Sequence, residues 1–306
     1  MDIGRVGLWT FLLDQHPTSR VRELAQEIEQ MGWPTLWRPE SSGRDVLISS
    51  SVLLDATSRL IVASGIAQIY ARHPVTTAAA QKTLFEAHDG RFLLGLGVAH
   101  APSVEGIRKL DYRTPYSDMV AYLEAMADAP YLAVEPATKP PTVLAALGPR
   151  MLRLSAEAAD GAHPYFTPPE HTAMARDILG EGPLLAPEQM VVIDRDLDRA
   201  RSVARTHMAR YLRLPNYTNN LLRCGFTQAD IDDVTDRLVD GIVACGDIDA
   251  TMRRVQEHHD AGADHVCIQV LAADNDLDVT IDHWRRLAEA FGLGHQTISA
   301  KPDRNS

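Results

Sequence analysis

The stretch GRFLLGLGVAH, residues 90–100, joins a short apolar run to two glycines and a histidine. Phe92–Gly97 has the length and unbroken hydrophobicity of a buried parallel strand. Glycine at the end of such a strand lets a ligand approach the backbone closely. Because the full GxGxxG fingerprint of dinucleotide sites is absent, the glycines alone predict no more than a tight turn.

Seven further apolar runs flank this one, each separated from the next by a segment with helical periodicity. The expected strands are Ile3–Trp9, Thr35–Arg38, Leu60–Ala67, Phe92–Gly97, Thr142–Leu147, Ala162–Phe166, Gln189–Ile193 and His265–Leu271. Eightfold alternation of strand and helix is typical of a closed barrel or of a long doubly wound sheet. No linker rich in Pro, Gly or Ser divides the chain. We therefore predict an α/β fold, a single (β/α)8 TIM barrel over residues 1–294.

Helices are expected between the strands, and one connection is longer than the rest. The clearest helices are Ser19–Met31, Pro74–Ala87, Arg195–Leu212, Ala250–His259 and Ile281–Phe291. Residues 194–264 separate the seventh and eighth strands, which predicts a helical insertion that includes Gln228–Ala244. Residues 295–306 are polar, and we expect this C-terminal tail to be disordered.

The composition of the chain argues against several classes of binding partner. The chain has 306 residues, of which 45% are hydrophobic, and a net charge of −11 that disfavours nucleic acid as a partner. The N-terminus lacks a signal-peptide pattern, and no apolar stretch approaches bilayer length. The three cysteines form no CxxC pair and there is no HExxH motif, so we expect no metal. The expectation is a cytoplasmic protein that acts on a small molecule, away from membranes.

Three other positions at strand ends could carry chemistry. Gly65 before Ile66 can mark a bulge, a non-prolyl cis peptide or an ordinary strand end. The Gly148-Pro149 step opens a helix whose free N–H groups suit an anion, with Arg150 adding charge, or it is a plain helix start. Glu40 closes the second strand, where its carboxylate would bind a ligand or pair with Arg38 or Arg44.

Taken in order, these segments resemble the luciferase-like monooxygenase superfamily, and most of all its branch assigned to coenzyme F420. The resemblance rests on Leu8–Thr10, Leu36–Glu40, Ser64–Ile66, Gly90–Gly97, Ala156–Gly161 and Ala261–Asp264. It implies a redox cofactor across the barrel mouth. The cofactor-binding residues that it implies are Gly65 and Ile66 behind the ring, Gly97, Val98 and Ala99 beside it, and Leu147, Gly148, Arg150 and Met151 at the phosphate.

The chain departs from the family pattern at three places. Some F420-dependent members carry a His after the second strand, where this chain has Ser41 and Ser42. Some carry a Glu after the fourth-strand glycines, where His100 stands. The phosphate-pocket Lys of some members has no match, and Arg150 would replace it. The acid–base candidates are therefore His100, whose ordinary pKa lies near working pH, and Glu40.

The leading functional hypothesis is an F420-dependent oxidoreductase that transfers a hydride between deazaflavin and a small organic substrate. One alternative is an FMN-dependent monooxygenase of the two-component type, fed by a separate reductase. Another is a cofactor-binding barrel without catalysis. The resemblance also implies a homodimer. Arg213, Asn216 and Tyr217 in the long connection are expected to roof the pocket, while Leu214, Tyr217 and Phe226 could instead form the dimer interface.

Overall fold

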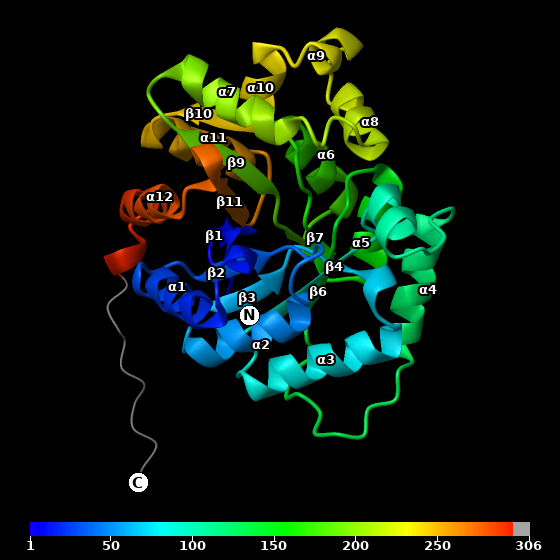
Figure 1. Cartoon of the computed structure of the whole chain (residues 1–306). Coiled ribbons are helices and arrows are strands. Elements are labelled where there is room, and N and C mark those ends of the chain that lie inside the picture. The colour runs from blue at the N-terminus through cyan, green and yellow to red at the C-terminus, as the bar shows by residue number, and fades with distance from the viewer. Residues whose placement is uncertain (296–306) are drawn as a thin grey trace.

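Parallel strands form the centre of the molecule (Figure 1). The computed structural model describes residues 1–295, so most of the predicted tail at 295–306 lies outside the described residues. The spatial order is β10-β9-β11-β1-β2-β3-β5-β6-β7-β8, with β4 beside β5. The strands are β1 (Val6–Trp9), β2 (Thr35–Arg38), β3 (Ile61–Ser64), β4 (Ala67–Gln68), β5 (Phe92–Gly97), β6 (Thr142–Leu144), β7 (Gly161–Ala162), β8 (Leu184–Leu185), β9 (Glu188–Ile193), β10 (Val243–Gly246) and β11 (Val266–Val270).

The segment from β8 into β9 closes the sheet on itself. On one side, Ala186 N donates to Ala162 O of β7 at 2.9 Å. On the other, Cys267 N of β11 donates to Pro187 O at 2.9 Å. One stretch of chain therefore bonds to β7 on one side and to β11 on the other, and the predicted TIM-barrel fold is confirmed.

Helices surround the strands on the outside (Figure 1). They are α1 (Thr18–Gln30), α2 (Val46–Ala56), α3 (Pro74–Ala87), α4 (Pro115–Ala127), α5 (Pro149–Ala158), α6 (Pro169–Leu179), α7 (Leu197–Met208), α8 (Pro215–Arg223), α9 (Gln228–Asp232), α10 (Asp236–Ile242), α11 (Ile248–Asp260) and α12 (Leu277–Ala290). Short 3-10 helices span Leu12–Gln15, Ile69–Ala71, Ala273–Asn275 and Leu293–His295, and a π-helix spans Pro102–Ile107.

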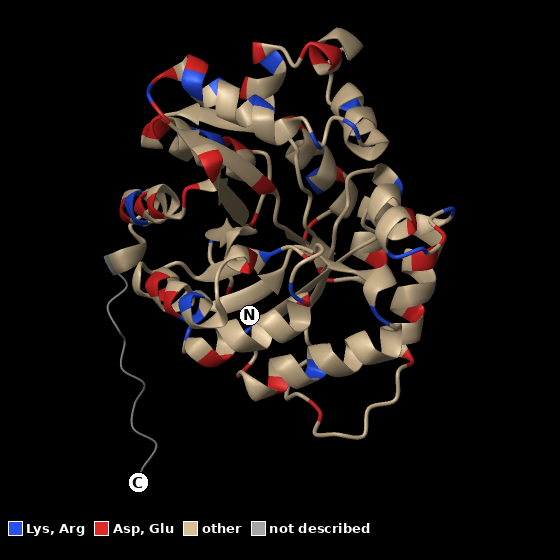
Figure 2. Ribbon diagram, viewed as in Figure 1, with Lys and Arg blue, Asp and Glu red and all other residues tan. Residues whose placement is uncertain are grey.

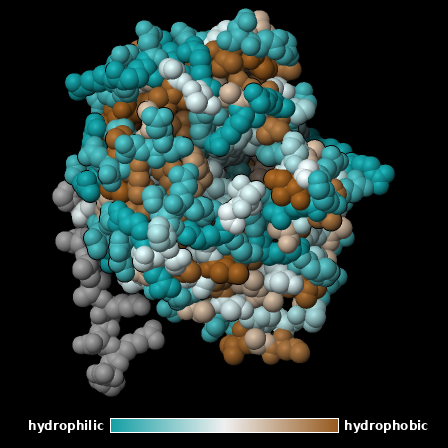
Figure 3. Space-filling view, in the orientation of Figure 1, coloured by the Kyte–Doolittle hydropathy of each residue, from teal (hydrophilic) through white to brown (hydrophobic). Residues whose placement is uncertain are grey.

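Charge lies mainly on these outer helices and loops, whereas the strands are largely uncharged (Figure 2). The surface is mostly hydrophilic, with an apolar patch over the loop that follows α4 (Figure 3). Among residues 1–295, every helix is too short or too polar to cross a bilayer.

Several predicted elements need correction. The helix expected at Gln228–Ala244 is two helices, α9 and α10, because Val234 takes a positive φ of 45° between them. From Val243 the chain is strand β10, which pairs with β9 and was not predicted. The third strand ends at Ser64 and resumes as β4 after Gly65 and Ile66. The sixth expected strand is β7 in the structure, and it stops at Ala162 where Phe166 had been expected.

A layer of inward-facing side chains fills the barrel below its carboxyl-terminal mouth. Trp37 is fully buried there, stacks on His163 with ring centroids 4.4 Å apart, and donates from Nε1 to His265 Nε2 at 3.1 Å. A second core joins the segment after β9 to the barrel, and Tyr217 and Phe226 are buried in it. Those two side chains are therefore not a surface for a partner, contrary to the dimer-interface alternative.

Candidate functional site

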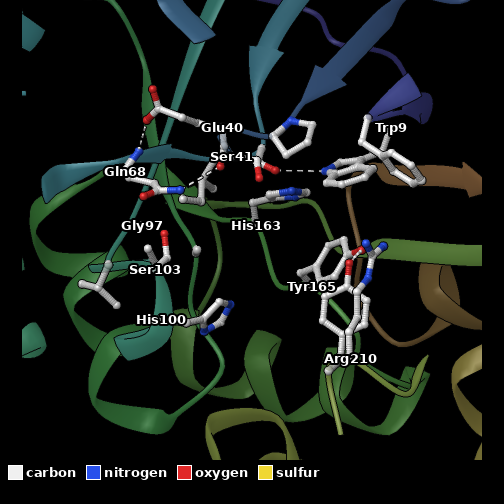
Figure 4. A pocket seen from close by; sticks show the side chains of 18 of the residues that line it. Trp9, Glu40, Ser41, Gln68, Gly97, His100, Ser103, His163, Tyr165 and Arg210 are labelled. Atoms are coloured by element: carbon white, nitrogen blue, oxygen red, sulfur yellow. Dashed lines mark hydrogen bonds between the residues drawn. The ribbon is translucent and has the colours of Figure 1, made fainter. Parts of the chain in front are cut away.

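A cavity of about 510 Å³ lies at the carboxyl ends of the strands. Figure 4 shows Gly97, Ser103 and His100 on one side of it and Trp9, Tyr165 and Arg210 on the other. The cavity brings together Glu40, Gly65, Ile66, Gly97, Val98, Ala99, His100 and Leu147 of the predicted site. Gly148, Arg150 and Met151 follow Leu147 at the start of α5 and do not line it.

One wall of the cavity is formed by backbone atoms, at glycine positions where a side chain would not fit. The Gly65–Ile66 peptide is cis, and Gly65 O accepts a hydrogen bond from Trp9 Nε1 at 3.1 Å. A Cβ on Gly65 would lie 2.8 Å from that indole nitrogen, and a Cβ on Gly97 would lie 2.6 Å from the Ile66 side chain. Only glycine keeps this wall flat at both positions.

Glu40 is occupied by protein partners. Its carboxylate accepts from Gln68 N at 2.7 Å and from Arg72 Nη1 at 3.0 Å. The predicted pairing with Arg38 or Arg44 is wrong, because Arg38 pairs with Asp14 and Arg44 lies 3.8 Å from the same carboxylate. Glu40 thus ties the loops after β2 and β3 together, which suits a structural role better than proton transfer. Arg72 is 32 residues from Glu40 in the sequence, so no local pattern indicated this pairing.

His100 lines the cavity just after β5. It follows Ala99, which takes a positive φ of 55°, and its ring lies 5.4 Å from that of Tyr217. Burial lowers the pKa of the His100 imidazole, and a hydrogen bond with Asn216 offsets part of that effect. A neutral imidazole facing a cavity can accept a proton from a ligand. Asn216 and Tyr217 line the cavity as expected, whereas Arg213 does not.

The start of α5 has the form of an anion site. Gly148 caps this helix without a side-chain hydrogen bond, and the first intrahelical bond runs from Leu152 N to Gly148 O at 3.1 Å. The amides of Arg150 and Met151 therefore have no intrahelical acceptor. The Arg150 guanidinium lies over the Tyr116 ring, 4.1 Å from its centroid.

A cation that the sequence pattern does not indicate faces this helix start. Arg223, at the end of α8, has its Nη2 4.0 Å from the position a Cβ on Gly148 would take. It comes from the long connection after β9, so no local pattern around the Gly-Pro step could have indicated it.

An aromatic wall lies opposite Gly97. Tyr165 is its centre: its hydroxyl donates to Gln269 Oε1 at 2.9 Å and lies 2.7 Å from the Tyr211 hydroxyl. The residues of this wall that line the cavity are Trp9, Phe11, Tyr165, Tyr211 and Tyr217. Tyr165 lies in the loop that follows β7, after His163 and Pro164, so an aromatic residue just beyond a strand end was the available signal.

Two titratable groups below the wall are kept neutral by burial. Burial raises the pKa of Glu188 to about 8, although Phe166 N donates to its carboxylate at 3.2 Å. Burial lowers the pKa of His163 to about 4. His163 Nδ1 lies 2.7 Å from Ala186 O, which can only accept, so that nitrogen carries the hydrogen. Within residues 1–295, no cluster of His, Cys, Asp and Glu is arranged to hold a metal ion.

Known proteins resemble this chain in sequence and in fold. The family model for luciferase-like monooxygenases matches residues 5–265. A Mycobacterium tuberculosis protein assigned by name as a coenzyme F420-dependent oxidoreductase is 25% identical, with 91% of this chain and 99% of that protein covered. The 5,10-methylenetetrahydromethanopterin reductase of Methanolobus tindarius is 24% identical, with 82% of this chain and 90% of the reductase covered.

Two solved structures share the fold. An F420-dependent secondary alcohol dehydrogenase, bound to an F420–acetone adduct, superposes with a TM-score of 0.74 at 15% identity, covering 92% of this chain and 97% of its own. The oxygenating constituent of 3,6-diketocamphane monooxygenase from Pseudomonas putida, bound to FMN, superposes with a TM-score of 0.72 at 12% identity, covering 93% and 97%. At such identities the likeness concerns the fold alone.

Proposed function

The chain belongs to the luciferase-like monooxygenase family, and on that premise we propose that it is an F420-dependent oxidoreductase acting on a small organic substrate. One observation carries the proposal. A flat wall of glycine backbone and a helix start with free amides lie together at the same barrel mouth. A planar ring with an anionic tail fits both features. The names of the F420-dependent relatives favour deazaflavin over flavin.

Bound deazaflavin would supply the acceptor or donor of the hydride. The chain's own residues supply the rest. Gly65, Ile66 and Gly97 support one face of the ring, and the amides of Arg150 and Met151, with the Arg223 guanidinium, hold the phosphate. His100 exchanges the proton that accompanies the hydride.

The second candidate is an FMN-dependent monooxygenase, favoured by the FMN-bound structural neighbour. The same glycine wall and helix start would accept FMN, whose tail also ends in a phosphate. A homodimer and a separate reductase remain predictions.

Equilibrium dialysis against F420 and against FMN tests the proposal. We expect the folded protein to bind F420 about tenfold more tightly than FMN, or about 1.4 kcal/mol. Tighter binding of FMN would favour the monooxygenase, and binding of neither would end the oxidoreductase proposal.

Gly97→Ala should weaken F420 binding about tenfold or more, because its Cβ drives the Ile66 side chain into the space proposed for the ring. Gly106→Ala is the matched control, since its Cβ would meet nothing within 4 Å.

His100→Gln is expected to lower kcat for oxidation of small secondary alcohols about 10²–10³-fold while F420 affinity stays the same. The reason is that Gln cannot accept the alcohol proton. The measurement is F420 reduction, followed by loss of the deazaflavin visible band, over a panel of such alcohols.

The pH profile of the native protein is the second readout for His100. Because the pKa of His100 is lowered, the native protein should gain activity as pH rises through that pKa and stay level above it. Activity that instead grows on acidification would contradict a base role. Binding of F420 without turnover on any alcohol would favour the non-catalytic barrel.

A further inference from the structure

The charges that line the cavity do not cancel. Its charged lining residues are Asp14, Glu40 and Arg210. Asp14 is paired with Arg38 and lies 3.8 Å from an Arg44 nitrogen, and Glu40 is paired with Arg72. Within residues 1–295, no carboxylate lies within ion-pair distance of Arg210. The cavity therefore holds one uncompensated positive charge.

Arg210 differs in this respect from the arginines just before it. On α7, Arg199 pairs with Asp196 at 3.3 Å and Arg201 with Asp240 at 2.7 Å, while Arg205 pairs with Asp236. These pairs lie away from the cavity, whereas Arg210 follows the helix and lines it. Arg210 is exposed and lines the cavity, so its guanidinium is free to pair with an anionic ligand there.

The guanidinium of Arg210, although the residue is exposed, contacts two aromatic rings and one imidazole. It lies 4.8 Å from the centroid of the Tyr211 ring and 5.5 Å from that of Phe11. Its Nη2 donates to His207 Nε2 at 2.9 Å. Burial first, and the charge of Arg210 second, lower the pKa of His207 to about 3, so that ring stays neutral and accepts. A side chain in contact with aromatic faces loses less entropy when it binds an anion.

The surroundings of Arg210 are flat and apolar. Phe11 packs edge-on to Trp9 at 6.4 Å, and Trp9 lies 5.2 Å from Tyr165. Figure 4 shows Arg210 beside Tyr165, across the cavity from Gly97 and His100. Such rings favour a planar apolar body in contact with them.

We propose that this side of the cavity binds a substrate with a flat, preferably aromatic, body and a carboxylate that pairs with Arg210. The inference rests on the proposed function, because it assigns the opposite side to the cofactor. The cofactor's tail is a second source of anionic charge, but the helix start at Gly148 with Arg223 gives that tail a site of its own.

Calorimetric titration of the cofactor-free protein with naphthalene carboxylate and with naphthalene carboxamide tests this assignment. The two probes share a flat body and differ in charge. We expect the carboxylate to bind about tenfold more tightly. Arg210→Leu should abolish that preference, and Arg210→Lys should keep part of it, since the charge remains without the planar fork. Arg213→Leu is the matched control, because Arg213 is exposed as Arg210 is but does not line the cavity.

Three results would overturn the proposal. Equal binding of the two probes would rule out the carboxylate contact with Arg210. A preference for the carboxylate that survives Arg210→Leu would rule it out as well. Failure of both probes to bind would remove the aromatic subsite. If Arg210→Leu weakened F420 or FMN binding as much as carboxylate binding, Arg210 would belong to the cofactor's tail. Because the titration contains no cofactor, its outcome is independent of whether the protein binds F420.

Discussion

Acidification below pH 6.5 is expected to destabilise the protein steeply, because its folded state keeps five histidines neutral. Burial is the main cause of each lowered pKa. The residues are His163, His171 and His265, with pKa values of about 4, and His207 and His258, with values of about 3. The unfolded chain binds protons at these groups from pH 6.5 downward, whereas the folded chain does not. Each group therefore removes up to about 1.4 kcal/mol of stability per pH unit.

The Glu188 carboxyl changes the free energy of unfolding in the opposite direction, because its stabilising contribution falls as pH rises. Its folded pKa of about 8 exceeds the ordinary 4.5, so the stability it contributes is fully present below pH 4.5 and is lost progressively as pH rises to about 8. Between 6.5 and 8 the histidines no longer contribute a slope, and stability should fall gently because of this one carboxyl. The free energy of unfolding should thus peak slightly below neutrality.

Chemical denaturation across this pH range is the measurement. Glu188→Gln should flatten the alkaline side, and His258→Gln should reduce the acid slope by about one proton. An unfolding free energy that stays constant below pH 6.5 would show that the buried imidazoles do not govern acid stability.

Arg72→Met is expected to lower the free energy of unfolding by about 3–5 kcal/mol. Arg72 Nη1 lies 3.0 Å from Glu40 Oε2, and its Nη2 lies 2.6 Å from Asp45 Oδ2. The Glu40 side chain is only 5% exposed, so without Arg72 it would be a buried charge with no counterion. The pair also joins the loops that precede α2 and α3.

Two variants sharpen the test of Arg72. Arg72→Met combined with Glu40→Gln should recover more than half of the loss, because the uncompensated charge is gone. Lys82→Met is the comparison, since its partner Glu135 is exposed and the pair contributes at most about 1 kcal/mol. Equal costs for Arg72→Met and Lys82→Met would refute the buried-pair account.

The barrel could be predicted because its strands are short apolar runs with clear ends. Thr35–Arg38, Phe92–Gly97 and the helix Pro74–Ala87 have the predicted bounds, and in each the apolar pattern stops at a turn or a proline. Strand β8 has only two residues, too few for any periodicity. Strand β10 was hidden because Val243 continues the apolar face of the helix before it.

The site was predictable where backbone defines it and not where distant side chains meet. The glycines at 65, 97 and 148 follow from the pattern at strand ends, and all lie at the same mouth or beside it. The partner of Glu40 did not follow, because Arg38 and Arg44 are close in sequence while Arg72 is close only in space. Likewise, the sequence placed Arg150 at the helix start proposed to hold an anion, but its side chain turns to Tyr116.

The indole of Trp9, bonded to the carbonyl of Gly65, gives the protein an internal optical probe. Of the four tryptophans in the chain, Trp9 alone lines the cavity, and Trp33, Trp37 and Trp284 lie in the packed interior. Emission from a single chromophore therefore responds when a molecule enters the mouth, while the other three report on whether the barrel is intact.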